Sequence, residues 1–416
     1  MIFRGRLWRH GDFLRLWAGQ SVSVLGTAVT WFALPSAAIL ALHAGPFQVG
    51  LLAALERLPF VFFSLLAGAW LDRVRRRPVM IACDVGRAVV LASIPIAALL
   101  HLLTLNQLYA VAFLVGTLTV FFDVAYLAYL PSLVPHGALL EGNTKMHAAH
   151  SLADLVGPGL AGVLVQALGA ARAIGLDALS YLVSIAMLLS IRTPEAREPF
   201  VEGAPPPSIR REIAEGLRWV WNQPLIRSQL IGLTVGGLGF WMALPMALVF
   251  IYDVIHLSPA LAGLVFVFEG VAALLGLLIS AAVVRFLNLG RTMWVTQLVI
   301  AAGLLLFPVA ALGFPFAVLA ASAFLLGLAD TVQDVNQVTL RQTQTPRRLQ
   351  GRMNATFRLF FWGTQPVASF LGGALASHVG PGATIFVGGV LAVGSAALIA
   401  FSPLGRVREA PEPVTI

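Results

Sequence analysis

Residues 68–78 read GAWLDRVRRRP, a short polar stretch between two long apolar runs. It contains one acidic residue, Asp72, and four arginines that follow it within five positions. Loops of this composition stay on the cytoplasmic side of a membrane, because lysine and arginine in short loops set the orientation of the flanking spans. The stretch therefore predicts a membrane protein and the side of the membrane that this loop faces.

The composition of the whole chain also indicates a membrane protein. Of its 416 residues, 58% are hydrophobic and 11% are charged. A water-soluble domain of this length could not bury so much apolar surface, so lipid is expected to be the solvent for most of it. The formal net charge of +8 would suggest nucleic acid as a partner of a soluble protein. Here the arginines cluster in loops between apolar segments, so we expect no nucleic-acid partner.

Twelve apolar segments are long enough to span a bilayer, which takes about 20 residues. They lie near residues 14–41, 47–70, 78–104, 107–130, 147–169, 172–191, 226–251, 259–284, 292–313, 315–338, 354–378 and 382–402. Loops predicted to be cytoplasmic hold most of the basic residues, whereas the opposite loops hold essentially Arg172 alone. The sequence predicts an all-α polytopic membrane protein with both termini in the cytoplasm. Because residues 1–15 carry four arginines and lead directly into the first apolar segment, we expect no cleavable signal peptide.

A polar, proline-rich stretch divides the twelve segments into two groups of six. It ends in an amphipathic segment at residues 209–221, which we expect to lie at the membrane interface with Trp219 and Trp221 toward lipid. Proline-rich, charged sequence is typical of a linker. We therefore predict an N-terminal six-helix bundle (1–191), a cytoplasmic linker with an amphipathic helix (192–224) and a C-terminal six-helix bundle (225–416).

The two halves align with one another as an internal repeat. Asp123 aligns with Asp334 and, after a small adjustment, Glu56 aligns with Glu269. Matched acidic residues inside apolar segments are rarer than matched glycines or leucines, so the alignment predicts a duplicated six-span unit. Duplicated units are typical of transporters whose halves rock about a site at their interface. The acid of the arginine loop has no counterpart in residues 285–291.

Several motifs resemble the major facilitator superfamily over essentially the full length of the chain. Residues 68–77 are similar to its signature Gly-x-x-x-Asp-Arg-x-Gly-Arg-Arg, with an arginine in place of the second glycine. GPGLAG at 157–162 is similar to the Gly-Pro-x-x-Gly-Gly motif of antiporters. LPSLVP at 130–135 and GRMN at 351–354 resemble the branch of macrolide-efflux proteins and enterobactin exporters. The superfamily's arginine motif in the fourth span is absent, because residues 107–130 contain no basic residue.

This resemblance implies two pseudo-symmetric six-helix bundles and secondary active transport by alternating access. It implies proton-coupled export of amphipathic small molecules, such as drugs, macrolides or siderophore-like compounds, by a multidrug antiporter of the bacterial inner membrane. The expected partners are the substrate, protons and membrane lipids, and the expected state is a monomer. A lipid or lysophospholipid flippase of the same fold is the alternative.

The arginine loop also predicts a gate. Asp72, at the cytoplasmic end of the second span, can accept hydrogen bonds from a helix N-terminus and pair with arginines. By resemblance, its partner in the outward-facing state is the start of the eleventh span, near Asn354. We predict a cytoplasmic gate of six charged residues, namely Asp72, Arg73, Arg76, Arg77, Asp84 and Arg87. The simpler alternative is that the arginines only orient the loop.

Acidic residues within the spans are the candidates for proton coupling. An ionised carboxylate is costly in hydrocarbon, so such a group faces a cavity, pairs with a base or stays protonated. A carboxyl group that changes between these conditions during transport would take up and release protons. Glu56 and Glu269 lie well inside their spans and suit this role best. The full candidate set is Glu56, Glu269, Asp123, Asp154, Asp330 and Asp334.

Two further sets of residues have predicted mechanical or binding roles. Small residues and a proline in the fifth span allow close helix approach and a bend; this helix-bending motif is Gly157, Pro158, Gly159 and Gly162. Aromatic residues in the seventh and eleventh spans suit amphipathic or cationic ligands. The predicted substrate cavity includes Trp241, Gln365 and Arg358.

The sequence favours neither an enzyme nor a sensor. It contains no HExxH motif, no paired CxxC and no phosphate loop, and its single cysteine, Cys83, excludes an internal disulfide. A membrane enzyme would need catalytic groups gathered at one depth, and a sensor would need a further soluble domain. We therefore expect no catalytic residue, no cofactor and no metal, and an ion gradient as the source of energy.

Overall fold

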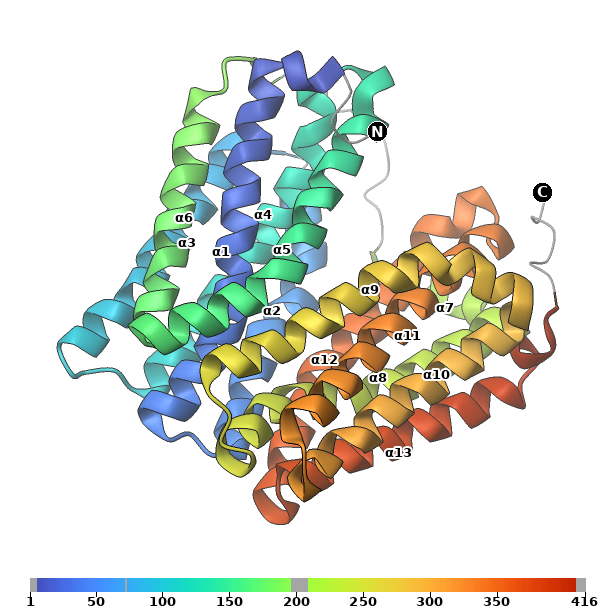
Figure 1. Cartoon of the computed structure of the whole chain (residues 1–416). Coiled ribbons are helices and arrows are strands. Elements are labelled where there is room, and N and C mark those ends of the chain that lie inside the picture. Colours follow the sequence, from blue (N-terminus) through green and yellow to red (C-terminus); the bar gives the residue numbers. More distant parts are fainter. Residues whose placement is uncertain (1–5, 72, 196–208, 409–416) are drawn as a thin grey trace. The chain divides into compact units, whose positions relative to one another are not determined.

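The computed structural model describes residues 6–71, 73–195 and 209–408. In these ranges the chain forms helices and no strand (Figure 1), which confirms the predicted all-α class. The long helices are α1 (Gly11–Leu42), α2 (Pro46–Leu71), α3 (Arg76–Leu99), α4 (Leu105–Leu133), α5 (Leu139–Leu168), α6 (Ala170–Ser190), α7 (Ile209–Asn222), α8 (Pro224–Val249), α9 (Pro259–Leu287), α10 (Leu289–Leu306), α11 (Pro315–Gln344), α12 (Gln350–Val379) and α13 (Pro381–Ala400).

Eleven helical segments within the described residues are long and apolar enough to cross a membrane. They coincide with eleven of the twelve predicted spans. The remaining predicted span corresponds to α12, which has 30 residues and is therefore long enough for a bilayer. Its most apolar stretch is less hydrophobic than those of the other eleven. The polytopic architecture follows from these twelve helices.

The contacts between residues divide the chain into two compact units. Unit 1 consists of residues 1–44, 55–202 and 258–264, and unit 2 consists of residues 45–54, 203–257 and 265–416. The units approximately follow the two halves of the sequence, with one short segment of each half grouped with the other unit. The exact boundaries of the three predicted parts stay a prediction.

Helix packing inside the two units follows one pattern. In unit 1, α1 packs against α5 and α6, and α3 packs against α4 and α6. In unit 2, α8 packs against α12 and α13, and α10 packs against α11 and α13. Each of these four pairs in unit 1 thus has a counterpart in unit 2, as a duplicated six-span unit requires.

Two connections of one residue each, one in each unit, have similar backbone angles. Gly169 alone separates α5 from α6, with φ 84° and ψ 152°. Gly380 alone separates α12 from α13, with φ 87° and ψ 160°. A positive φ in this region strains residues that have a Cβ atom, so a reversal of the chain over one residue requires glycine.

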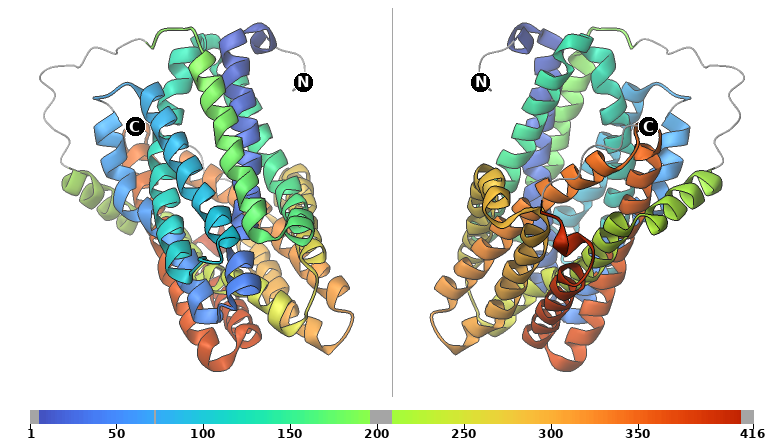
Figure 2. Two further views of the ribbon diagram at one scale, coloured as in Figure 1. Left: turned by 90° about the vertical axis from the view of Figure 1, so that its left-hand side faces the viewer. Right: turned by 90° about the vertical axis from the view of Figure 1, so that its right-hand side faces the viewer.

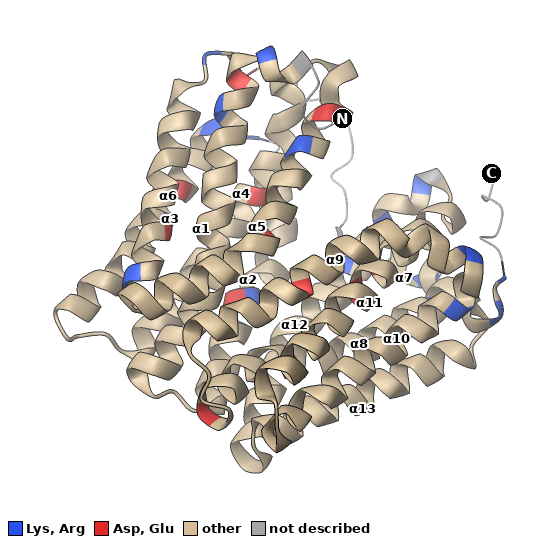
Figure 3. Ribbon diagram, viewed as in Figure 1, with Lys and Arg blue, Asp and Glu red and all other residues tan. Residues whose placement is uncertain are grey.

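Basic residues gather toward one end of the helices in each unit (Figure 3). In unit 1 this is the end where α1 begins: Arg9 precedes that helix and Arg15 lies in its first turns, while Arg192 follows α6. Within each unit the distribution is therefore one-sided, as the orientation rule for membrane proteins requires. The cytoplasmic location of the termini stays a prediction.

The predicted amphipathic segment forms α7, which lies on the outside of unit 2 (Figure 2). It packs against α12 and α8. Trp219 packs against a buried cluster around Val220, whereas Trp221 is exposed. The expectation that both tryptophans face lipid is therefore wrong for Trp219, because α8 and α12 cover that side of the helix.

Candidate functional site

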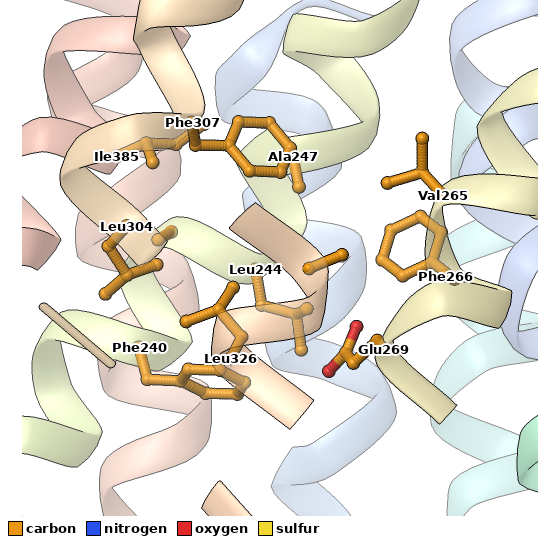
Figure 4. Close-up of a pocket in the computed structure, with 12 residues that line it drawn as sticks. Phe240, Leu244, Ala247, Val265, Phe266, Glu269, Leu304, Phe307, Leu326 and Ile385 are labelled. Atoms are coloured by element: carbon orange, nitrogen blue, oxygen red, sulfur yellow. The ribbon is translucent and has the colours of Figure 1, made fainter. Parts of the chain in front are cut away.

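Unit 2 contains a pocket between α8, α9, α10, α11 and α13 (Figure 4). Three aromatic rings, those of Phe240, Phe266 and Phe307, line it together with aliphatic side chains. The carboxylate of Glu269 is the one charged group in the lining. Figure 4 shows this carboxylate near Phe266, Leu244 and Leu326. The pocket thus combines an apolar, aromatic wall with one acidic group.

A close approach of two helices positions Glu269. It lies within α9, where it is the one charged residue before Arg285. A Cβ atom on Gly327 of α11 would lie 2.1 Å from the carbonyl oxygen of Glu269. Only glycine permits such contact between backbones. This contact fixes the height of the carboxylate relative to α11.

Two further acids of the predicted set lie on α11. Asp330 and Asp334 are four residues apart, on one face of the helix, and both are exposed. The charge of Asp330 interacts with those of Glu269 and Asp334. The Asp334 carboxylate also accepts a hydrogen bond from the side-chain amide of Gln337. The structure therefore gathers the three predicted acids of unit 2 into one acidic region.

Unit 1 repeats this arrangement with one difference. A Cβ atom on Gly116 of α4 would lie 2.5 Å from the carbonyl oxygen of Glu56, so the glycine and acid correspond to Gly327 and Glu269. The Glu56 carboxylate, however, lies 3.8 Å from the guanidinium of Arg57. Among the described residues, Glu269 has no such ion pair. The duplicated acids thus have different electrostatic surroundings.

Asp84 and Arg87 form an ion pair in the interior of unit 1. Their side chains are 0% and 4% exposed. The Arg87 guanidinium also stacks on the rings of Phe122 and Tyr181, 4.2 Å and 4.5 Å from their centroids. The pair therefore ties α3 to α4 and α6 inside the bundle, and its predicted part in a cytoplasmic gate stays a prediction.

Asp177 of α6 is also buried, and it is not among the predicted site residues. Its carboxylate accepts hydrogen bonds from the hydroxyl groups of Thr30, at 2.5 Å, and Ser180, at 2.9 Å. The bond from Thr30 joins α1 to α6, whereas Ser180 lies on α6 itself. The criterion that selects the other acids, a carboxylate in an apolar segment, also selects Asp177.

The arginine loop is bound to the end of α6 within unit 1. Asp72 lies outside the described residues, and Arg73 is exposed. The Arg77 guanidinium donates hydrogen bonds to the carbonyl oxygens of Leu188, at 2.9 Å, and Leu189, at 3.0 Å. Arg75, which replaces the usual glycine, has φ −69°. Glycine is not required at this position, because any residue adopts that conformation.

Glu195, which no motif singled out, caps the helix that follows this loop. Its carboxylate accepts hydrogen bonds from the backbone N–H groups of Arg76, at 2.7 Å, and Arg77, at 3.2 Å. The first N–H groups of a helix have no acceptor within the helix, and a negative charge is stabilised there. Glu195 and Arg76 are 119 positions apart in the sequence, so no local sequence pattern predicts this contact.

Replacing Glu195 by Ala should destabilise the protein by about 1 kcal/mol, because α3 loses its cap. The measurement is thermal unfolding of the purified protein in detergent. Arg192→Gln is the matched control, since it removes a charge from the same segment, while among the described residues Arg192 bonds only through its backbone N–H, to Asp12. Equal melting temperatures for Glu195→Ala and wild type would show that the cap contributes nothing.

The other predicted residues are not among those that line the pocket. Asp154 is exposed on α5. In the helix-bending motif, Gly157, Pro158 and Gly162 are buried, and a Cβ atom on Gly157 would lie 2.4 Å from that of Ala28. Close packing of α5 on α1 is thus established, while the bending role of the motif, which includes Gly159, stays a prediction.

None of the three residues of the predicted substrate cavity lines the pocket. The ring of Trp241 lies 5.6 Å from that of Phe240, between centroids. Gln365 is 2% exposed, and Arg358 is exposed. The neighbouring residue Phe240 lines the pocket instead, because successive side chains of a helix point about 100° apart.

Comparison of the sequence with known families places the chain among membrane transporters. The family described as transmembrane secretion effector matches residues 7–414. The multidrug efflux pump Tap of Mycolicibacterium fortuitum is 26% identical, over 89% of this chain and 90% of that protein. The enterobactin exporter EntS of Citrobacter koseri is also 26% identical, over 97% of this chain and 94% of that protein.

Solved structures of transporters have the same fold. The nucleoside transporter NupG, as its D323A mutant, superposes with a TM-score of 0.73 at 12% identity, covering 94% of this chain and 99% of NupG. A bacterial homologue of the iron transporter ferroportin, in its inward-facing state, superposes with a TM-score of 0.70 at 14% identity, covering 95% of this chain and 100% of that protein. At these identities the likeness establishes the fold alone.

Proposed function

Since this chain belongs to the family of transmembrane secretion effectors, and is a multi-pass efflux transporter of the major facilitator superfamily, we propose that it exports amphipathic small molecules in exchange for protons by alternating access. The likeness to Tap and EntS supports small molecules of the drug or siderophore kind. The bacterial inner membrane is the proposed location. The family and the relatives are membrane transporters, so the protein is not an enzyme.

The observation that carries this proposal is the Glu269 carboxylate in an otherwise apolar pocket. Its aromatic and aliphatic walls suit the apolar part of an amphipathic molecule, which requires the pocket to open, because in this structure it has room for about one water molecule. A carboxylate in such surroundings has to be neutralised by a proton or by a cation. The same group can therefore hold either a proton or the cationic group of a substrate, and exchange of one for the other is antiport.

The asymmetry between the two units favours Glu269 over Glu56 as the exchanging acid. Arg57 already supplies a positive charge 3.8 Å from the Glu56 carboxylate. Glu56 therefore already has a counter-ion, whereas Glu269 has none among the described residues. Glu56 is therefore assigned a supporting role, and Asp330, Asp334, Asp123 and Asp154 stay further candidates for proton coupling.

Transport by the purified protein in proteoliposomes tests the proposal. A pH gradient across the vesicle should drive accumulation of hydrophobic cationic dyes and macrolides, and a protonophore should abolish it. The panel also includes a fluorescent lysophospholipid. If only the lysophospholipid moves, the protein is a flippase and the proposal is wrong. Movement of dyes that is indifferent to the pH gradient would contradict proton coupling.

A further inference from the structure

One side of α7 is bound tightly to the rest of unit 2. A Cβ atom on Gly216 would lie 2.6 Å from the carbonyl oxygen of Arg352 in α12, so the backbones of α7 and α12 touch. Val220, one turn further, is fully buried in a cluster with residues of α8 and α12. The Glu215 carboxylate lies 2.5 Å from the Arg352 guanidinium. Packing and charge together fix α7 to the start of α12.

The opposite side of α7 carries large apolar side chains that the described part of the chain leaves open. Leu217 and Trp221 are 37% and 52% exposed. Because they are four residues apart, they lie on the same face of the helix. Ala214, one turn before Leu217, is exposed as well. We call these three residues the apolar stripe. Apolar residues therefore extend around α7 beyond the side that α8 and α12 cover.

The apolar stripe lies at the edge of a membrane-spanning helix. Only Gln223 separates the end of α7 from the start of α8, and α8 begins one of the spans. The stripe is thus within about two helical turns of the point where the chain enters the bilayer. Tryptophan is enriched at this depth, since its ring has an apolar body and a polar edge.

Two arginines flank the stripe. Arg218 is exposed, and no ion pair of the described residues includes it. The Arg227 guanidinium donates a hydrogen bond to the carbonyl oxygen of Trp221, at 3.3 Å, which holds its charge at the end of the stripe. Apolar and aromatic side chains with arginines beside them form the pattern of helices that lie in an anionic membrane surface.

We propose that the apolar stripe inserts into the boundary between headgroups and acyl chains of one leaflet, and that Arg218 and Arg227 bind anionic lipid headgroups there. By the distribution of basic residues, this is the cytoplasmic leaflet. Helix α7 then connects the lipid surface to the start of α12. This interaction surface does not depend on the transported substrate or on proton coupling.

Site-specific fluorescence quenching in nanodiscs that contain one full-length protein each tests this proposal. The buried Cys83 is replaced by Ala, and a small fluorophore is attached to Leu217→Cys or to the matched control Asn222→Cys. Asn222 is also exposed but belongs to the polar side of α7. The probes are nitroxide-labelled phosphatidylglycerol, nitroxide-labelled phosphatidylcholine and aqueous iodide.

At position 217 the fluorophore should be quenched by the lipid nitroxides, more strongly by phosphatidylglycerol than by phosphatidylcholine, and protected from iodide. At position 222 iodide should quench and the lipids should not. Arg218→Gln should weaken the binding of phosphatidylglycerol near position 217 about fivefold and leave quenching by phosphatidylcholine unchanged.

Three results would overturn the proposal. The first is iodide quenching at position 217 equal to that at position 222. The second is equal quenching by the two lipids, which would remove the role of the arginines. The third is protection from iodide and from both lipids, which would mean that protein covers the stripe. Because quenching does not measure export, these results leave the proposed function untouched.

Discussion

Replacing Glu269 by Gln is expected to reduce pH-driven export to the level of liposomes without protein. Glutamine has the shape of a protonated glutamate but cannot release a proton, so the pocket would stay in its neutral form. Exchange of substrate down its own gradient, which needs no proton, should persist. The measurement is dye transport in proteoliposomes, once with an imposed pH gradient and once in counterflow.

Glu56→Gln is the matched control for this experiment. The two residues align in the repeat, and each lies against a glycine of a neighbouring helix, Gly116 or Gly327. They differ in that Arg57 pairs with Glu56, so Glu56→Gln should slow pH-driven export without abolishing it. Wild-type pH-driven export by Glu269→Gln would refute the assignment of Glu269. An equal loss in both variants would show that the ion pair does not distinguish the two acids.

Cationic substrates should depend on Glu269 more than neutral ones of similar size. In Glu269→Gln the apolar wall formed by Phe240, Phe266 and Phe307 remains, so neutral amphipathic molecules keep most of their contacts. A cation loses its counter-charge in the pocket. The comparison is the dissociation constant of a cationic and a neutral dye, measured by fluorescence on the purified protein. Equal losses for the two dyes would contradict a direct contact between substrate and carboxylate.

Replacing Arg87 by Met is expected to cause the largest loss of stability, about 3–5 kcal/mol. The change leaves the Asp84 carboxylate in the interior of unit 1 without its ion-pair partner, since neither side chain is more than 4% exposed. Contacts of Arg87 with the rings of Phe122 and Tyr181 are lost as well. Thermal unfolding in detergent, followed by aggregation or by the yield of monodisperse protein, measures the effect.

The double variant Asp84→Leu with Arg87→Met separates charge from packing. It removes both charges, so most of the lost stability should return. Arg73→Gln is the control for loss of an arginine, because Arg73 is exposed and should tolerate the change. If Arg87→Met is as stable as wild type, the ion pair does not hold α3 in unit 1.

The positions of the helices could be predicted because they follow from local composition. An apolar run of about 20 residues has to become a helix in lipid, where each backbone group needs an internal hydrogen bond. The amphipathic segment became α7 for a related reason, since its apolar residues recur at helical spacing. Polar residues make the most apolar stretch of α12 less hydrophobic than those of the other spans, but the length of the segment still predicts a span.

Residue roles were predicted less completely, because they depend on neighbours that are distant in the sequence. Glu269 was singled out as an acid within a span, but the pocket around it is built from five helices. The aromatic ring of Trp241 predicts that it lines the substrate cavity, but the adjacent Phe240 lines the pocket instead. Asp84 and Arg87 were recognised as a pair by their spacing, whereas their burial beside Phe122 and Tyr181 has no local signal.

The arginine loop and the repeated acids of the two halves are visible in the amino-acid sequence, and from them follow the spans, the duplication and the transporter family. Those features are local, because bilayer thickness and charge near a span act on each segment separately. The Glu56–Arg57 pair joins neighbours in the sequence, whereas only the tertiary structure decided that Arg77 binds the end of α6 and that Glu195 caps α3. Contacts of this kind arise where helices pack, and packing depends on the shapes of side chains that lie a hundred or more positions apart.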